Sequence, residues 1–135
     1  MDVHSPETRS KNMSRIRGRD TKPELIVRKI VHRMGYRYRL HKPELPGKPD
    51  IALVRLGKII EVRGCFWHLH QCPKGQKFPA ERKSFWQLKR ENTVKRDERN
   101  LRELKRAGWK VLIVWECETK KPAGLQKRID RFLTK

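Results

Sequence analysis

"PDIALVRLGKIIEVR", residues 49–63, contains two apolar runs, 51–54 and 59–62, on either side of a glycine turn. Two short apolar runs joined by such a turn predict a β-hairpin. Asp50 then lies at the mouth of the first strand, and ten residues separate it from Glu61 on the second strand. Because the strands of a hairpin lie side by side, we expect these two carboxylates to be neighbours, an arrangement that suits a hard cation such as Mg²⁺.

Arg63 stands two residues after Glu61, so both side chains are expected on the same face of the strand. Pro49-Asp50, ten residues and then Glu61-x-Arg63 resemble the PD-(D/E)xK nuclease pattern, with arginine in the lysine position. The motif is short, and two other interpretations fit it. Asp50 can cap a turn while Glu61 pairs with a surface lysine, or Glu61 can form an ion pair with Arg63.

The flanking sequence predicts a single α/β domain, 1–135, with a mixed sheet flanked by helices. Strands are expected at 36–40 and 109–115, and the second is apolar on both faces, like a central strand covered on both sides. Capping residues and apolar spacing predict helices over 6–16, over 21–35, from Ser84, separately from Asn92 to Gly108, and over 120–135. The side chains expected in the core from these helices include Leu25, Ile26, Ile30, Met34, Val94, Leu101, Leu104, Leu125, Ile129 and Phe132.

The chain is strongly basic, with 35 Lys and Arg against 15 Asp and Glu and a formal net charge of +20. Such a surface attracts polyanions, usually nucleic acid, although a solvated basic surface without a specific partner fits the charge as well. No apolar run approaches the roughly 18 residues of a membrane span, and no signal-peptide segment opens the sequence. We therefore expect no membrane association and a cytoplasmic protein with reduced thiols.

Most of the metal-binding side chains gather in the segment GCFWHLHQC. Cys65, Cys72 and a histidine offer three ligands there, and Cys117 can supply a fourth from the end of the last strand. Three cysteines and one histidine form a closed tetrahedral set typical of structural zinc. The spacing leaves open whether His68 or His70 is the nitrogen ligand, and three ordinary buried thiols are the alternative.

Six motifs follow one another along the chain, namely TRSKNMSRI, RDTKPE, LPGKPDI, GCFWHLHQC, FWQLK followed by RD, and GWKVLIVWEC. They occur in the order found in the very-short-patch-repair (Vsr) mismatch endonucleases, which the chain resembles from about residue 3 to residue 117. The resemblance implies a restriction-endonuclease-like fold with a structural zinc site. It also implies an Mg²⁺-dependent DNA endonuclease that nicks one strand next to a T:G mismatch left by deamination of 5-methylcytosine.

The resemblance implies roles for the two histidines of the GCFWHLHQC segment. It assigns His70 to zinc, together with Cys65, Cys72 and Cys117. His68 is then free to act as a general base that activates water. Packing beside the metal site is the alternative for His68.

Together, the hairpin pattern and the resemblance assign the catalytic residues. Asp50, Glu61 and the backbone carbonyl of Val62 would hold Mg²⁺, and Arg63 would stabilise charge on the phosphate. Glu24 matches an active-site acid of the family. Because Glu24 also stands at the third position of a capping box, helix capping is the alternative for it.

Aromatic residues and a basic arm are the expected DNA contacts. Phe66 and Trp67 lie between the zinc ligands, and Trp86 stands in the motif FWQLK. In the family, the matching aromatics form a wedge between base pairs, which unstacks and bends the duplex; burial in the core is the alternative. The N-terminal arm, 1–19, matches the family's DNA-clasping arm, although a disordered basic tail fits it too. The arm residues assigned to DNA are Lys11, Met13 and Arg15.

Val62-Arg63 stands where better-known Vsr enzymes carry Thr-His, and those enzymes lack a carboxylate at the position of Glu61. The departure bears on substrate preference more than on strand cleavage. One alternative is a related nuclease without mismatch specificity, and another is a non-catalytic zinc-containing nucleic-acid-binding protein. The resemblance implies a monomer in a bacterial-type cytoplasm, associated with the nucleoid, with mismatched double-stranded DNA and mismatch-repair proteins as partners.

Overall fold

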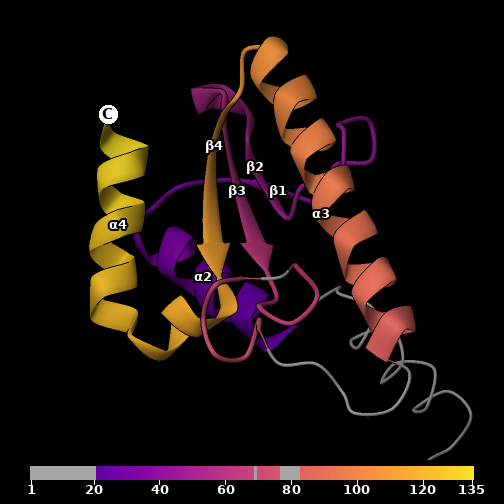
Figure 1. Ribbon diagram of the computed structural model, residues 1–135. Coiled ribbons are helices and arrows are strands. Elements are labelled where there is room, and N and C mark those ends of the chain that lie inside the picture. The colour runs from indigo at the N-terminus through magenta and orange to yellow at the C-terminus, as the bar shows by residue number, and fades with distance from the viewer. Residues whose placement is uncertain (1–20, 69, 77–82) are drawn as a thin grey trace, which may run out of the picture.

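A four-stranded mixed sheet in the order β1-β2-β3-β4 forms the centre of the molecule. β1 (Arg39–Leu40), β2 (Ile51–Leu53) and β3 (Lys58–Arg63) are antiparallel neighbours, and β4 (Lys110–Trp115) runs parallel to β3. Helices flank the sheet on both faces (Figure 1). The predicted α/β class with a mixed sheet is therefore confirmed.

The computed structural model describes residues 21–68, 70–76 and 83–135. The predicted helix over 6–16 and the arm residues Lys11, Met13 and Arg15 lie outside these ranges. Among the helices in the described ranges, none is both long and apolar enough to span a bilayer.

The predicted hairpin is confirmed, with its connection shifted by one residue toward the N-terminus. Ile51 pairs with Ile60 across β2 and β3. The strand predicted to reach Val54 ends one residue earlier, because a 3-10 turn, η1 (Val54–Leu56), begins there. The turn ends at Gly57, whose φ of 68° is a left-handed conformation that glycine adopts without steric cost.

β4 lies at the edge of the described sheet, so it is not the central strand that its apolar sequence indicated. α3 (Lys83–Arg106) covers one face of the sheet beside it, and α4 (Pro122–Thr134) covers the other (Figure 1). Because helices bury both faces, this edge strand needs the apolar pattern of a central one. The strand predicted over 36–40 also shortens to β1, since Tyr36 and Tyr38 pack against the core before the strand begins.

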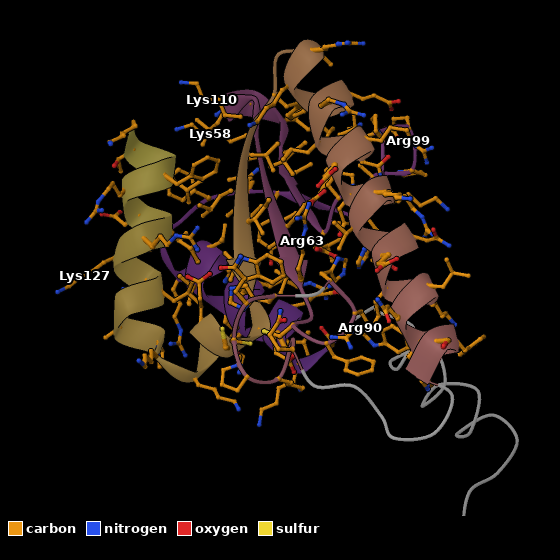
Figure 2. All side chains as sticks on the ribbon, in the orientation of Figure 1. Lys58, Arg63, Arg90, Arg99, Lys110 and Lys127 are labelled. Carbon is orange, nitrogen blue, oxygen red and sulfur yellow. The ribbon has the colours of Figure 1, made fainter. Side chains whose placement is uncertain are left out.

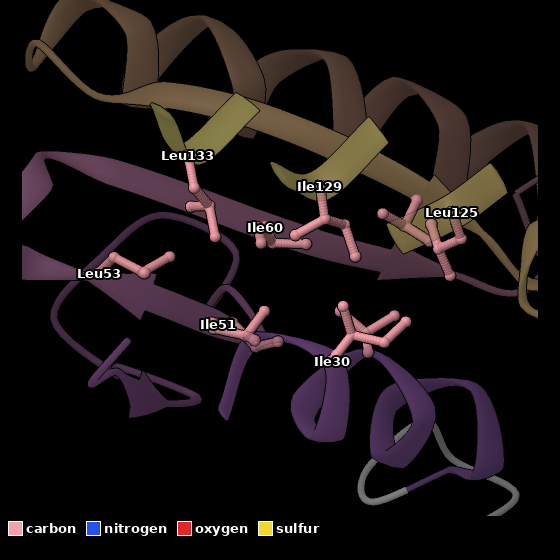
Figure 3. Close-up of a cluster of buried hydrophobic side chains, with 10 residues drawn as sticks. Ile30, Ile51, Leu53, Ile60, Leu125, Ile129 and Leu133 are labelled. Carbon is pink, nitrogen blue, oxygen red and sulfur yellow. The ribbon is translucent and has the colours of Figure 1, made fainter. Parts of the chain in front are cut away.

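The larger core lies between the sheet, α2 (Lys22–Arg33) and α4 (Figure 3). Its buried side chains are Val27, Ile30, Val31, Ile51, Leu53, Ile60, Val114, Leu125, Ile129 and Leu133. Leu25 is 45% exposed, so its predicted core position is wrong: the buried stripe of α2 runs through Val27 on another side of the helix. On α4, Leu133 is the buried position, and Phe132 packs beside it only partly buried.

α3 is one continuous helix of 24 residues, whereas the sequence predicted two stretches with a new start at Asn92. The stretch contains no glycine or proline, so nothing interrupts its hydrogen bonds. It is about 36 Å long, against about 20 Å for β4. Its first half therefore extends past the ends of β3 and β4, as Figure 1 shows. The second half covers a small core made by Ala52, Ile59 and Leu104.

Candidate active site and metal centre

A cavity of about 920 Å³ lies beyond the ends of β3 and β4, beside the first half of α3. Figure 2 shows Arg63 and Arg90 toward this end of the molecule, with Lys58 and Lys110 at the opposite end. The cavity lining includes Glu24, Asp50, Glu61, Arg63, Phe66, Trp67, His68 and Asp97. The acids predicted from the hairpin and two of the predicted DNA-contacting aromatics therefore share one cavity.

Asp50 is held at the mouth of the hairpin by the neighbouring strand. Its Oδ2 accepts a hydrogen bond from the backbone N–H of Val62 at 2.7 Å. Burial raises the pKa of Asp50 to about 8, and the negative charge of Glu24 acts in the same direction. A carboxylate in this setting is stabilised when a cation binds beside it, so Asp50 fits a ligand of a hard divalent cation.

Glu24 and His41 are the closest metal-binding companions of Asp50. One donor atom from each of the three residues lies within 4.8 Å of the others. His41 is 3.6 Å from the Glu24 carboxylate through Nε2 and 3.8 Å from the Asp50 carboxylate through Nδ1. Sequence reasoning gave no role to His41, because the loop after β1 carries no recognisable ligand spacing. The donors of this group suit a divalent cation.

Glu24 takes part in the helix cap and in the site at the same time. Its backbone N–H donates to the side chain of Thr21 at 3.4 Å, which is the capping bond at the start of α2. Its carboxylate pairs instead with Arg28 at 3.0 Å and lies in the group with Asp50. The cap thus uses the main chain of Glu24 and leaves the carboxylate in the cavity.

Glu61 and Arg63 form an ion pair on β3 rather than a shared acid pair with Asp50. Their closest atoms are 3.0 Å apart, and the two side chains are only 13% and 11% exposed. Burial raises the pKa of Glu61, an effect that Arg63 opposes. Within the described residues, Nε of Arg63 is buried without a hydrogen-bond partner. The pair is part of the cavity wall, and Nε of Arg63 is a buried donor that this pairing leaves unused.

His68 is oriented by an acid that sequence reasoning missed. Its Nδ1 lies 2.5 Å from Oδ2 of Asp97 on α3. When Nδ1–H donates to Asp97, the opposite ring nitrogen is left as the basic atom, which is the arrangement a general base needs. A signal was present, since Asp97 is the aspartate of the RD pair that follows FWQLK in the motifs shared with the family.

The thiols and one histidine form a second potential metal centre. One donor atom each from Cys65, His70, Cys72 and Cys117 lies within 4.8 Å of the others. Sγ of Cys117 is 3.6 Å from Nδ1 of His70. Two ligands at zinc–sulfur and zinc–nitrogen distances across a tetrahedral angle would be about 3.6 Å apart, so the donors fit a tetrahedral ion. His70 rather than His68 is the histidine beside the thiols.

The surroundings of this centre hold its ligands in place. The ring of Trp115 stacks on His70, with centroids 4.1 Å apart and planes at 17°. A carboxylate oxygen of Glu116, in the 3-10 turn η2 (Glu116–Lys120), accepts the N–H of Cys65 at 3.2 Å. The backbone N–H of Gly75 lowers the pKa of the Cys72 thiol to about 6. Cys72 is therefore close to the thiolate form that a metal requires.

Phe66, Trp67 and Trp86 form one cluster that stands apart from both apolar cores. Their ring centroids lie 5.1 to 5.9 Å apart in edge-to-face and tilted arrangements. Each is half-buried, and Phe85 extends the cluster as a ring that is 43% exposed. Lys89 lies over the rings, with its Nζ 5.6 Å from the centroid of the Trp67 ring. The cluster is therefore an aromatic surface with a cation beside it, open to a ligand in the cavity.

One face of α3 supplies further cavity residues that sequence reasoning missed. Their spacing of four, three and four positions puts them on one helix face, and they are Lys89, Thr93, Arg96 and Asn100. Asn100 packs against Gly47, where an added Cβ would come within 2.8 Å of its side-chain nitrogen. The backbone of the LPGKPD loop thus lies close against α3, and the two basic residues of this helix face line the cavity.

Comparisons with known proteins show which family the chain resembles. Residues 1–74 match the family model described as DNA mismatch endonuclease Vsr. The type II nicking enzyme V.XorIIP of Xanthomonas oryzae pv. oryzae is 41% identical over 132 residues, covering 98% of this chain and 96% of the relative. The type II nicking enzyme V.NmeAIP of Neisseria meningitidis serogroup A is 39% identical over 132 residues, covering 98% and 94%.

The similarity extends over nearly the whole chain, including the loop and turn that carry the cysteines and the helix that carries Asp97. The DNA mismatch endonuclease Vsr of Escherichia coli is 41% identical over 133 residues, covering 98% of this chain and 83% of the relative. The chain belongs to the Vsr family of DNA mismatch endonucleases.

Proposed function

We propose that the protein is an Mg²⁺-dependent endonuclease that nicks one DNA strand next to a T:G mismatch. The coarser part follows from its family, which makes the chain a DNA nicking endonuclease with a DNA substrate. One observation supports the finer part: Phe66 and Trp67 line the same cavity as Asp50 and the His68–Asp97 pair. Rings that enter a base step from this cavity would therefore act beside the phosphate that is cut.

Asp50 and Glu24 are the proposed carboxylate ligands of the catalytic cation, with His41 beside them. When bound, Mg²⁺ would offset the negative charge that develops on the attacked phosphate. Glu61 and the carbonyl of Val62 remain proposed ligands. Glu61 would have to leave its pairing with Arg63 to reach the cation, so Glu24 is the better-supported partner of Asp50.

Hydrolysis is assigned to the side chains around this cation site. His68 takes a proton from the water that attacks phosphorus, and Asp97 stabilises the resulting imidazolium. The bond from phosphorus to the 3′ oxygen breaks, and the leaving oxygen takes a proton from a solvent water. This leaves a 5′-phosphate and a 3′-hydroxyl, and His68 then returns its proton to solvent. Arg63 is assigned to a non-bridging oxygen, and its guanidinium would have to turn toward the cavity for the buried Nε to donate to it.

Zinc is the proposed ion of the Cys65, His70, Cys72 and Cys117 group. Three thiolates and one imidazole saturate a tetrahedral ion, so no position is left for substrate, and the role is structural. A bound ion would join the loop 64–76 to the end of β4 through Cys117. That loop carries both His68 and the aromatic rings, so zinc would hold the catalytic and DNA-contacting parts together.

A T:G pair is the proposed target because the family resemblance implies it, and insertion of rings costs less at a wobble pair than at a matched pair. The relatives named as type II nicking enzymes carry no mismatch in their names. A nicking enzyme without mismatch preference is thus the second candidate. The two candidates differ in the ratio of nicking rates on mismatched and matched duplexes.

The test is single-turnover nicking of one end-labelled duplex family in Mg²⁺. The duplexes carry T:G, each other mismatch or the matched pair at one position, with the flanking bases varied. We expect T:G to be nicked faster than its matched counterpart by at least about 100-fold, which is on the order of 3 kcal/mol. Equal rates on T:G and matched duplexes would establish the second candidate, and no nicking of any duplex would contradict the catalytic assignment.

A further inference from the structure

Arg90 is a fully buried cation on α3, with 0% of its surface exposed. Its Nε donates to the backbone carbonyl of Phe66 at 2.6 Å, and its Nη2 donates to the carbonyl of Gly75. The guanidinium also lies 4.2 Å from the centroid of the Phe66 ring. A buried charge is retained only where hydrogen bonds compensate its desolvation, so these contacts bind α3 firmly to the loop.

The two carbonyls lie on either side of the part of the loop that contains two of the proposed zinc ligands, His70 and Cys72. Phe66 follows Cys65, and Gly75 stands three positions after Cys72. One planar guanidinium therefore joins both ends of this segment to the helix, and it does so through protein groups alone. This connection is separate from the proposed zinc, which would join the same loop to β4.

The position of Arg90 on α3 relates it to the aromatic cluster. Trp86 stands one helical turn before it, on the same face of the helix. The rings of Phe66 and Trp67 come from the loop, and their centroids lie 5.9 and 5.5 Å from that of Trp86. Two structural elements thus contribute to one cluster, and Arg90 is the buried polar contact between them. Figure 2 shows it near the start of α3, where the helix extends past the sheet.

We propose that Arg90 is a positioning residue of the DNA interface, which holds the Phe66 and Trp67 rings in register with Trp86 before DNA binds. This inference rests on the proposed insertion of these rings at a mismatch. Each side chain that must become ordered on binding weakens the interaction, and rings that are already ordered avoid that loss. The rings then enter the base step as one body, and the cleaved phosphate meets His68 in a fixed place.

Two substitutions test the role of Arg90. Arg90→Lys keeps the charge but loses the planar fork of donors that spans the two carbonyls, and Arg90→Met removes both hydrogen bonds at similar length. Arg99→Met is the matched control, because Arg99 is an exposed arginine farther along the same helix. Zinc content and thermal unfolding are measured first, and nicking is compared well below each unfolding midpoint.

The deciding readout is the ratio of single-turnover rates on T:G and matched duplexes at saturating protein. We expect Arg90→Met to lower this ratio about 10-fold to 100-fold, with Arg90→Lys intermediate and Arg99→Met unchanged. A purely structural defect reduces the amount of folded enzyme, so it lowers both rates together and leaves their ratio unchanged. The fluorescence of 2-aminopurine next to the mismatch should fall in parallel, because the base step is unstacked less often.

Three results bear on the proposal. A lowered ratio with intermediate Arg90→Lys supports it. A wild-type ratio in both Arg90 variants, measured on folded and zinc-loaded protein, overturns it while leaving mismatch nicking intact. A wild-type enzyme that shows no preference for T:G overturns the proposed mismatch function, and this inference with it.

Discussion

The two faces of the sheet use alternate residues of the same strands, yet they bury different kinds of side chain. On the α2 and α4 face, Ile51, Ile60 and Val114 join the large apolar core. On the α3 face, the neighbouring positions carry only a small core toward one end, and at the other end they carry Glu61 and Arg63. One face therefore supplies most of the apolar stabilisation, and the other holds the polar site.

Two buried cations, one on each face of the sheet, show the same difference between a structural face and a functional one. Lys58, 5% exposed, donates to the carbonyls of Phe132, Leu133 and Lys135 at 2.7 to 3.1 Å and so caps the end of α4. Arg90 joins the functional loop to α3 on the other face. Both satisfy main-chain acceptors, but only Arg90 lies beside the cavity. A buried cation that binds main-chain carbonyls therefore holds two segments together, and the residues around it decide whether function depends on that contact.

The largest effect on nicking is expected from substitution of Asp50 in the polar site. Asp50→Asn keeps an acceptor for the Val62 N–H but loses the charge that a cation needs, so nicking should fall by about 10³-fold or more. DNA affinity should be equal or higher, because a negative charge facing phosphate is gone. Rates and binding isotherms in Mg²⁺ check both points. Near-wild-type nicking by this variant would remove Asp50 from the site.

The raised pKa of Asp50 should also make the stability of the metal-free protein depend on pH. The pKa of Asp50 is raised from 3.8 in the unfolded chain to about 8 in the fold. Its contribution is therefore fully present below about pH 4 and is lost as pH rises toward 8, since the native state binds the proton more tightly. Denaturant titrations across this range should give a weaker pH dependence for Asp50→Asn than for wild type.

The second-largest effect should come from Asp97, which acts only through His68. Asp97→Asn can present its amide to Nδ1 and favour the wrong tautomer, so nicking should fall about 10²- to 10⁴-fold. Unfolding should change little. Glu103→Gln, an exposed acid on the same helix, is the control for the lost charge. If Asp97→Asn and Glu103→Gln nick equally fast, His68 needs no orienting acid.

Substitutions in the core on the α2 and α4 face should lower the free energy of unfolding and leave the nicking rate unchanged. Ile129 is 0% exposed in the large core, and Ile129→Ala should lower the free energy of unfolding by about 2–5 kcal/mol. The nicking rate of the folded fraction at low temperature should be unchanged. Lys127→Ala, on the outer side of α4, is the matched control (Figure 2). A specific loss of nicking in Ile129→Ala would show that the two faces are coupled.

The smallest effect is expected at the buried lysine of the stable face. Lys58→Met leaves the last carbonyls of α4 without their donor, which should cost about 1–3 kcal/mol. Lys110 is the residue opposite Lys58 in β4 but is exposed, so Lys110→Met should cost much less. Chemical denaturation of the pair checks the difference. Equal midpoints for the two variants would mean that the α4 cap contributes nothing.

Sequence patterns correctly predicted the features that depend on residues close to one another in the chain. The hairpin, the start of α2 at Thr21 and the apolar stripe of α4 follow from turn residues, capping and spacing. Periodicity gave wrong predictions where the same local pattern is compatible with two different structures. An edge strand covered by two helices has the apolar pattern of a central strand, and α3 contains a capping-like residue, Asn92, that caps nothing.

The sequence by itself determined the kinds of groups available: a hairpin with acids at its mouth, a Cys and His segment, and aromatics beside it. Residue type and spacing are enough for that, because strand pairing and ligand chemistry act over a few residues. Only the tertiary structure decided which groups meet. Asp50 lies with Glu24 and His41, Glu61 with Arg63, and His68 with Asp97, since packing of α2 and α3 against the sheet brings distant segments together. No local period encodes such contacts; they depend on how the whole core closes.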